Sequence, residues 1–184
     1  MRDGIIEQRD GRVTCRYERL LHHSIEVVWK AITDPEEIER WMGSRPEIDL
    51  RAGGHYISYH QARDRVVDRI ERVEVPRLFA HTFWVHVNPT ALVTWELVPT
   101  EPGCRLALTH SLGTDDVRTA AATVALGDDP SVIMSRNAAG WHRLLDKLEA
   151  VLDGQTTDWS EQDGQALRAR YAAMLAQNDS QQLQ

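Results

Sequence analysis

Residues 24–43 read SIEVVWKAITDPEEIERWMG and constrain the fold strongly, because they predict two short helices in immediate succession. Ser24 is a favourable N-cap, and apolar residues follow it at helical spacing. The Asp34-Pro35 pair then ends the first helix and begins the second, since aspartate suits an N-cap and proline the first helical position. Each helix carries one tryptophan, Trp29 or Trp41, and these rings either brace a packed core or line a hollow one.

Strands are predicted on both sides of these helices. Residues 12–22 alternate, with an apolar face on the odd positions, as in a half-buried strand. The Gly53-Gly54 pair predicts a bulge or bend. Short connections between the later strands indicate an antiparallel meander. These later strands are expected in residues 46–50, 55–60, 66–75, 77–87, 91–98 and 104–110.

A long helix is predicted after the last strand. Asp129 and Pro130 are suited to its N-cap and first position, and Gly154 to its end. Within it, Gly140 costs helix stability, so we expect a close approach of a neighbouring element there. A shorter helix over residues 119–126 is expected before it. The apolar stripe of the long helix contains Met134, Ala138, Trp141, Leu145, Leu148 and Leu152. A final amphipathic segment contains Leu167, Tyr171, Met174 and Leu175.

Composition narrows the possible partners and the compartment. The chain has 184 residues, 42% hydrophobic and 27% charged, which suits one globular domain. Its net charge of -7 argues against nucleic acid and against an anionic membrane surface. No apolar run approaches a membrane span, and we expect a cytoplasmic protein. Cys15 and Cys104 are too few for a disulfide framework and are expected to remain free thiols.

Three stretches resemble a known family. They are ERLLHHSIEVVWKAITDPEEIERWM, LRAGGHYISY and NAAGWHRLLDKLEAVLDG, at residues 18–42, 50–59 and 137–154. They are similar to the START-like (SRPBCC) superfamily, and within it to the group named after the C-terminal domain of the heat-shock-protein-90 ATPase activator. The resemblance covers residues 11–154.

The resemblance implies an α+β helix-grip fold, START-like and Bet v 1-like. A curved antiparallel sheet would wrap around the long C-terminal helix, and the two short helices would close one end. Trp29 would then be buried against the sheet, and Trp41 would stand at the mouth of a cavity. Residues 155–184 are expected to form a helical C-terminal extension with a disordered tail, packed on the outside of the sheet or on a second subunit in a homodimer.

Local motifs predict neither a metal site nor a catalytic set. The sequence contains no HExxH, no CxxC, no GxSxG and no glycine-rich phosphate loop. Histidine pairs such as His81 and His86 are five residues apart, so they should point to opposite faces of a strand. The paired carboxylates Asp115-Asp116 and Asp128-Asp129 lie beside predicted helix starts, where capping explains them. We therefore expect no catalytic residues, no metal and no cofactor.

A cavity between the sheet and the long helix is the expected ligand site. His110 shares the inward face with Leu106 and Leu108, where it could orient a ligand carbonyl, act as a general base or serve as a hydrogen-bonded core residue. Arg19 also faces inward, to meet an anionic ligand or to form a structural ion pair with a carboxylate on the sheet. The candidate ligand-binding residues are Arg19, Trp41, Tyr56, Trp95, His110 and Trp141.

Three functions remain in competition. The leading hypothesis is non-catalytic binding of an apolar, possibly aromatic, small molecule. The second is an enzyme, a cyclase or hydrolase of polyketide-like substrates, using His110 with Arg19 or a tyrosine. The third is a chaperone-interaction module. A large apolar cavity would favour binding, convergent polar groups would favour catalysis, and a filled core would favour the interaction module.

Overall fold

The computed structural model describes residues 3–59, 65–117 and 130–182, and in the last of these stretches it describes the side chains of residues 132–177. Its strands are β1 Ile5–Arg9, β2 Arg12–Leu21, β3 Glu47–Ile48, β4 His55–Tyr59, β5 Arg65–Glu74, β6 Leu78–Thr82, β7 Leu92–Thr100 and β8 Gly103–Gly113. Its helices are α1 Ile25–Thr33, α2 Pro35–Met42, α4 Pro130–Leu152 and α5 Glu161–Gln182.

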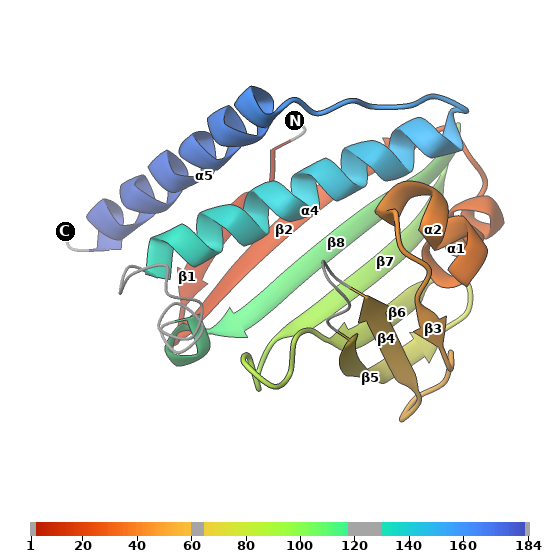
Figure 1. The fold of residues 1–184 in the computed structure, drawn as a ribbon, viewed down its shortest axis with the longest axis horizontal. Coiled ribbons are helices and arrows are strands. Elements are labelled where there is room, and N and C mark those ends of the chain that lie inside the picture. The colour runs from red at the N-terminus through yellow and green to blue at the C-terminus, as the bar shows by residue number, and fades with distance from the viewer. Residues whose placement is uncertain (1–2, 60–64, 118–129, 183–184) are drawn as a thin grey trace.

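The eight strands form one antiparallel sheet in the order β1-β2-β8-β7-β6-β5-β4-β3. Helix α4 lies across the inner face of this sheet, and α1 and α2 cover one end (Figure 1). The predicted helix-grip fold is therefore confirmed. The odd positions of β2 from Val13 to Leu21 are buried, as the alternation of the sequence predicts.

The two short helices begin where their caps predict. The Ser24 hydroxyl accepts a hydrogen bond from the backbone N–H of Val27. The Asp34 carboxylate accepts from the N–H groups of Glu36 and Glu37, and Pro35 is the first residue of α2. These caps satisfy backbone donors that have no partner inside the helix. The turn between α1 and α2 thus holds both helices at one end of the sheet.

Strand β1 was not predicted. It pairs with β2 through a tight hairpin in which Asp10 has φ 50° and Gly11 has φ 72°. Two successive residues with positive φ form the hairpin turn that Asp-Gly favours most. The signal was therefore present in the sequence, as an Asp-Gly pair directly before the alternating segment that forms β2.

Strand β6 is shorter than its predicted range, residues 77–87, because Asp68 forms hydrogen bonds with residues that follow Thr82. The Asp68 carboxylate, which is buried, accepts hydrogen bonds from the Thr82 hydroxyl and from the backbone N–H groups of Trp84 and Val85. Trp84 has φ 52°, which is incompatible with a continuing strand. A carboxylate on β5 thus ends β6 at Thr82.

Helix α4 begins at Pro130, as predicted, but the expected close approach at Gly140 is wrong. A Cβ added at Gly140 would meet nothing within 4 Å, leaving helix backbone and chain neighbours aside. The helix ends before Gly154, which has φ 69°. Asp128, Asp129 and the helix expected over residues 119–126 lie outside the described residues.

Helix α5 packs against α4 and β1, not on the outside of the sheet (Figure 1). Its apolar residues Leu167, Tyr171 and Leu175 are buried in the same core as β2 and α4. The Tyr171 hydroxyl accepts a hydrogen bond from the backbone N–H of Gly4 at 2.8 Å, so α5 also holds the segment before β1. The helix runs to Gln182, into the tail that was expected to be disordered.

Candidate functional site

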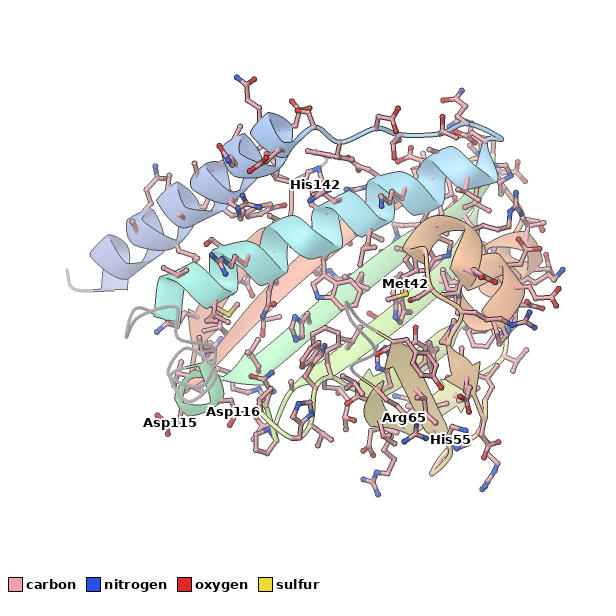
Figure 2. The ribbon with its side chains drawn as sticks, in the orientation of Figure 1. Met42, His55, Arg65, Asp115, Asp116 and His142 are labelled. Atoms are coloured by element: carbon pink, nitrogen blue, oxygen red, sulfur yellow. The ribbon has the colours of Figure 1, made fainter. Side chains whose placement is uncertain are left out.

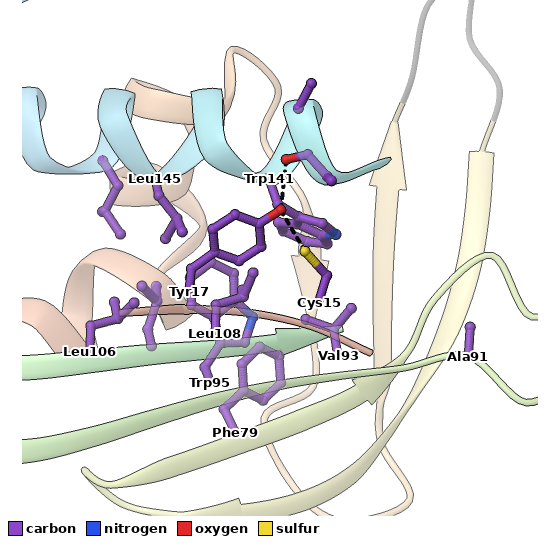
Figure 3. Close-up of a cluster of buried hydrophobic side chains, with 14 of the residues drawn as sticks. Cys15, Tyr17, Phe79, Ala91, Val93, Trp95, Leu106, Leu108, Trp141 and Leu145 are labelled. Carbon is purple, nitrogen blue, oxygen red and sulfur yellow. Dashed lines mark hydrogen bonds between the residues drawn. The ribbon is translucent and has the colours of Figure 1, made fainter. Parts of the chain in front are cut away.

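Eight ring-bearing side chains form a continuous group between the sheet and the helices α2 and α4, which we call the inner aromatic cluster. The sheet contributes members from β4, β6, β7 and β8 because alternate residues of a strand share a face. Figure 3 shows its central part, where Trp141 of α4 lies over Trp95 of β7 and Phe79 of β6. The members are Trp41, Tyr56, Phe79, His81, Phe83, Trp95, His110 and Trp141.

The rings of this cluster contact one another edge to face or stacked. Trp95 is central: its ring is 6.2 Å from that of Trp41 and 5.9 Å from that of Trp141. Phe79 pairs directly with Trp95 across β6 and β7. Such ring pairs add about 0.5–1.5 kcal/mol each to the gain from burial. The cluster is thus a well-packed apolar wall on the inner face of the sheet.

His110 brings a polar group into this wall. The indole N–H of Trp141 donates to His110 Nδ1 at 3.1 Å. Burial, together with a smaller contribution from the nearby His81, lowers the pKa of His110 to about 3, so the ring is neutral. An acceptor Nδ1 in a neutral ring places the hydrogen on Nε2. This Nε2 is buried and has no hydrogen-bond partner among the described residues.

His81 and Phe83 belong to the cluster but were not predicted as site residues. His81 aligns with Val93 and His110 across β6, β7 and β8. Its ring stacks on Tyr56 at 4.6 Å, its Nδ1 lies 2.6 Å from the Thr82 carbonyl oxygen, and burial lowers its pKa to about 4. Comparing histidines within one strand could not reveal that His81 and His110 share this face, because the two residues belong to different strands.

Trp41 is buried and does not stand at a cavity mouth, so that expectation is wrong. Its side chain is 4% exposed, against 8% for Trp29, which is buried as expected. The indole N–H of Trp41 donates to the Ala31 carbonyl at 2.9 Å. This hydrogen bond ties the Trp41 ring to α1 and directs it inward, towards Trp95. Both tryptophans therefore belong to the packed interior.

Tyr56 lies at the edge of the cluster nearest α2. Its hydroxyl contacts Met42 Sδ at 3.8 Å, and burial raises the pKa of Tyr56 above its ordinary value. Figure 2 shows Met42 beneath α2, on the side that faces the sheet. A thioether is a weak acceptor, so this contact leaves the hydroxyl weakly engaged. Tyr56 thus adds another polar group to the inner face, besides His81 and His110.

Arg19 does not join the cluster. Its guanidinium pairs with Asp146 at 3.2 Å and with Glu149 at 3.9 Å, and both carboxylates belong to α4. The predicted structural ion pair exists, but its partners lie on the helix, not on the sheet. Arg19 aligns with Leu106 on β8, four residues from His110, or about 13 Å along an extended strand. The structure therefore separates Arg19 from His110.

Asp146 also connects Arg19 to a polar network between α4 and α5. His142 Nε2 lies 3.5 Å from the Asp146 carboxylate, and His142 Nδ1 lies 2.9 Å from the Tyr171 hydroxyl. Figure 2 shows His142 on the side of α4 that faces α5. This network fixes the two helices to each other and to β2. Its groups are engaged with protein partners, which fits a structural role.

Neither a metal-binding cluster nor a membrane-spanning helix is found within the described residues. No group of three or more His, Cys, Asp or Glu side chains in this part of the chain could hold a metal ion. Among the described helices, none is long and apolar enough to cross a membrane. Cys15 and Cys104 are buried free thiols, as predicted.

Four depressions formed by described residues lie outside the inner aromatic cluster. One of about 620 Å³ is lined by the segment before α5 and by the first turns of α5. Another of about 340 Å³ lies between α4 and α5. Within the cluster itself, the rings contact one another, so a ligand that enters there must separate them.

The sequence matches the family model described as Activator of Hsp90 ATPase homolog 1-like protein over residues 22–153. The chain belongs to this family. It is a START-like member, and the match spans all the elements from α1 to α4, including every member of the inner aromatic cluster. No curated protein matches the chain significantly.

Solved structures of similar fold include proteins from three bacteria. A conserved protein of unknown function from Enterococcus faecalis, EF2215, has a TM-score of 0.73 and 16% identity, over 95% of this chain and 91% of that one. CalU16 from Micromonospora echinospora has a TM-score of 0.67 and 21% identity, over 95% and 98%. Protein BH1534 from Bacillus halodurans has a TM-score of 0.62 and 22% identity, over 80% and 99%. At these identities the likeness shows the fold alone.

Proposed function

We propose that this protein binds an apolar aromatic small molecule between the sheet and α4, without changing it chemically. The molecule lies among the rings of the inner aromatic cluster and offers a hydrogen-bond acceptor, such as a carbonyl oxygen, to His110 Nε2. The observation that carries this proposal is the buried Nε2–H group without a partner among the described residues.

A buried donor without a partner costs about 1–3 kcal/mol, and a ligand acceptor would recover part of that cost. The surrounding rings supply apolar contact area, and Trp141 fixes the orientation of the imidazole through its indole N–H. A site of many apolar groups and a few oriented polar groups is typical of small-molecule binding. Family membership supports the proposal because the fold places a sheet and a helix around this region.

Binding is favoured over catalysis by the same residues. A general base works best with a pKa near the working pH, whereas the pKa of His110 is about 3. Arg19, the other residue considered for chemistry, is held by Asp146 and Glu149 of α4. Arg19 and His110 therefore do not converge on one point where a substrate could react.

The test uses two rigid probes that differ by one carbonyl, 9-fluorenone and fluorene. We expect both to bind one site per chain, seen as saturable quenching of tryptophan fluorescence, with fluorenone binding at least fivefold more tightly. His110→Leu keeps an apolar side chain of similar size but removes the donor. This variant should bind the two probes equally.

The matched control is His55→Leu, because His55 is exposed on β4. It should keep the preference for fluorenone. If neither probe shows saturable binding to the wild-type protein, the cluster is a filled core, and the chaperone-interaction function becomes the better explanation. If fluorenone keeps its advantage in His110→Leu, the assigned donor is wrong.

A further inference from the structure

We propose that the groove between α4 and α5 is a second binding site, which takes a soluble phosphate-bearing small molecule. The groove has a volume of about 340 Å³ and is separate from the inner aromatic cluster. Its occupant is recognised through arginine side chains from both helices. The residues that line it are Arg136, Ala139, Gly140, Arg143, Gly164 and Arg168.

Helical spacing brings these residues onto one groove. Arg136, Gly140 and Arg143 follow one another at intervals of four and three on α4, and so share a face. Gly164 and Arg168 are four residues apart on α5. The two helices therefore present their glycines as a floor and their arginines as walls.

The glycines leave room where side chains would otherwise fill the groove. A Cβ at Gly140 would project into space without meeting an atom within 4 Å, other than its own helix backbone. A Cβ at Gly164 would lie 3.5 Å from Arg143 Nη1 and 3.8 Å from Arg168 Nη1. Two guanidinium groups thus approach one point from opposite helices, and that point carries no side chain.

The arginines lack the carboxylate partners that compensate other arginines of this chain. Within the described residues, Arg136, Arg143 and Arg168 form no ion pair, whereas Arg170 of the same helix pairs with Asp3 at 2.8 Å. Arg143 Nε is buried and has no hydrogen-bond partner in the same part of the chain. Like charges held together repel, so an anion in the groove would relieve the repulsion and satisfy that donor.

Neighbouring groups hold Arg143 in place without neutralising it. Its guanidinium carbon lies 5.7 Å from the centre of the Trp159 ring, a cation–π contact. The Ser160 hydroxyl caps α5 by accepting from the Asp163 N–H, and the nearby Asp163 carboxylate accepts in return from the Ser160 hydroxyl at 2.6 Å and from the Ser160 N–H at 3.2 Å. Asp163 is thereby engaged away from the arginines, and the groove stays electropositive in a chain with a net charge of -7.

Arginine favours phosphate because its planar donors match two phosphate oxygens at once. The volume of the groove is at the small end of the range for small-molecule sites, which fits a phosphate with a short organic body. The negative net charge of the chain disfavours docking on an anionic lipid surface. A soluble phosphate compound is therefore the occupant that the charges and the volume fit together.

The experiment titrates the full-length protein with inorganic pyrophosphate by isothermal calorimetry at low ionic strength, where electrostatic attraction is least screened. We expect one saturable site per chain. Arg143→Gln and Arg168→Gln should each weaken binding at least tenfold. Gly140→Met should weaken it as much, because the new side chain fills the groove while every charge is kept.

Arg105→Gln is the control, since Arg105 is a partly exposed arginine on β8 paired with Glu18. It should leave the affinity unchanged within twofold. Binding unaffected by Gly140→Met, or weakened equally by Arg105→Gln, would mean general charge attraction and overturn the proposal. Attachment to vesicles containing phosphatidic acid, without any binding of pyrophosphate, would also overturn the proposal. If Arg143→Gln does not fold, Arg168→Gln and Gly140→Met decide the question.

Discussion

Individual residues on the inner face of this sheet differ in how completely their polar atoms are satisfied. Tyr17 is fully buried, and its hydroxyl donates to the Ala138 carbonyl at 2.7 Å and accepts from the Cys15 thiol at 2.9 Å. His110 is nearly as buried, yet one of its two nitrogens has no partner in the described part of the chain. Native interiors rarely leave such groups unpaired, so an exception points to a site.

The pKa of His110 makes a prediction about acid stability. The pKa of the folded-state ring is about 3, against an ordinary value of 6.5 in the unfolded chain. As the pH falls below 6.5, His110 binds a proton in the unfolded chain but not in the folded protein. The free energy of unfolding should therefore fall, and this one histidine accounts for about 2 kcal/mol of the loss between pH 7 and pH 5.

Urea unfolding at pH 7 and pH 5 checks this effect. His110→Gln keeps an acceptor for the Trp141 indole but cannot take up a proton, so its loss between the two pH values should be smaller by about that amount. Carboxylates such as Glu37 affect both proteins alike and cancel in the comparison. Equal losses in the two proteins would show that His110 titrates normally.

At the same scale, the sequence predicted some of the site and missed the rest for identifiable reasons. Alternation along a strand placed Trp95 and His110 on the inner face correctly. It could not reveal His81 beside them, because register between strands is set by tertiary pairing. Trp41 was misplaced because the resemblance implies where the second helix lies, but not the hydrogen bond from the Trp41 indole to the Ala31 carbonyl.

At the scale of elements, caps and turn residues were the most reliable signals. Ser24 and Asp34 cap their helices as predicted because the hydrogen bonds involved are local. Gly140 and Gly154, by contrast, are both glycines but differ in backbone conformation. Gly154 has a φ that side chains rarely adopt, whereas Gly140 is an ordinary helical residue beside open space.

These two glycines form a matched pair of predictions. Gly140→Ala should raise the free energy of unfolding by up to about 1 kcal/mol, because alanine favours the helix and meets no obstacle. Gly154→Ala should lower it by about 1 kcal/mol, because a left-handed conformation is strained for alanine. Chemical denaturation of both variants measures the two effects. A loss of stability in Gly140→Ala would restore the close packing that the sequence suggested.

At the scale of the whole molecule, the segment before β1 packs against the middle of α5. The Tyr171 hydroxyl of α5 joins the backbone of Gly4 and the ring of His142 on α4. Arg170 adds an ion pair to Asp3. This arrangement could not be predicted from sequence, because the direction of α5 depends on tertiary contacts with α4 and with the segment before β1.

Tyr171→Phe tests the importance of this junction. The variant keeps the ring but leaves the Gly4 N–H and the His142 ring without their shared partner, so the free energy of unfolding should fall by about 1–3 kcal/mol. Tyr59→Phe is the control, since that hydroxyl bonds Glu47 at the surface, and its effect should stay within about 0.5 kcal/mol. Equal effects in thermal melts would mean that the junction is only a surface contact.

The junction also shows that the folded domain extends beyond the residues that the family model matches. The family match covers residues 22–153, whereas the hydrogen bonds at Tyr171 and the pairing of β1, β2 and β8 lie partly or wholly beyond it. β2 lies between β1 and β8, and α5 packs on the gripped helix. The stretch that the family model matches is therefore shorter than the stretch that packs into one core, and a fragment cut to residues 22–153 would lose β2, an inner strand of the sheet.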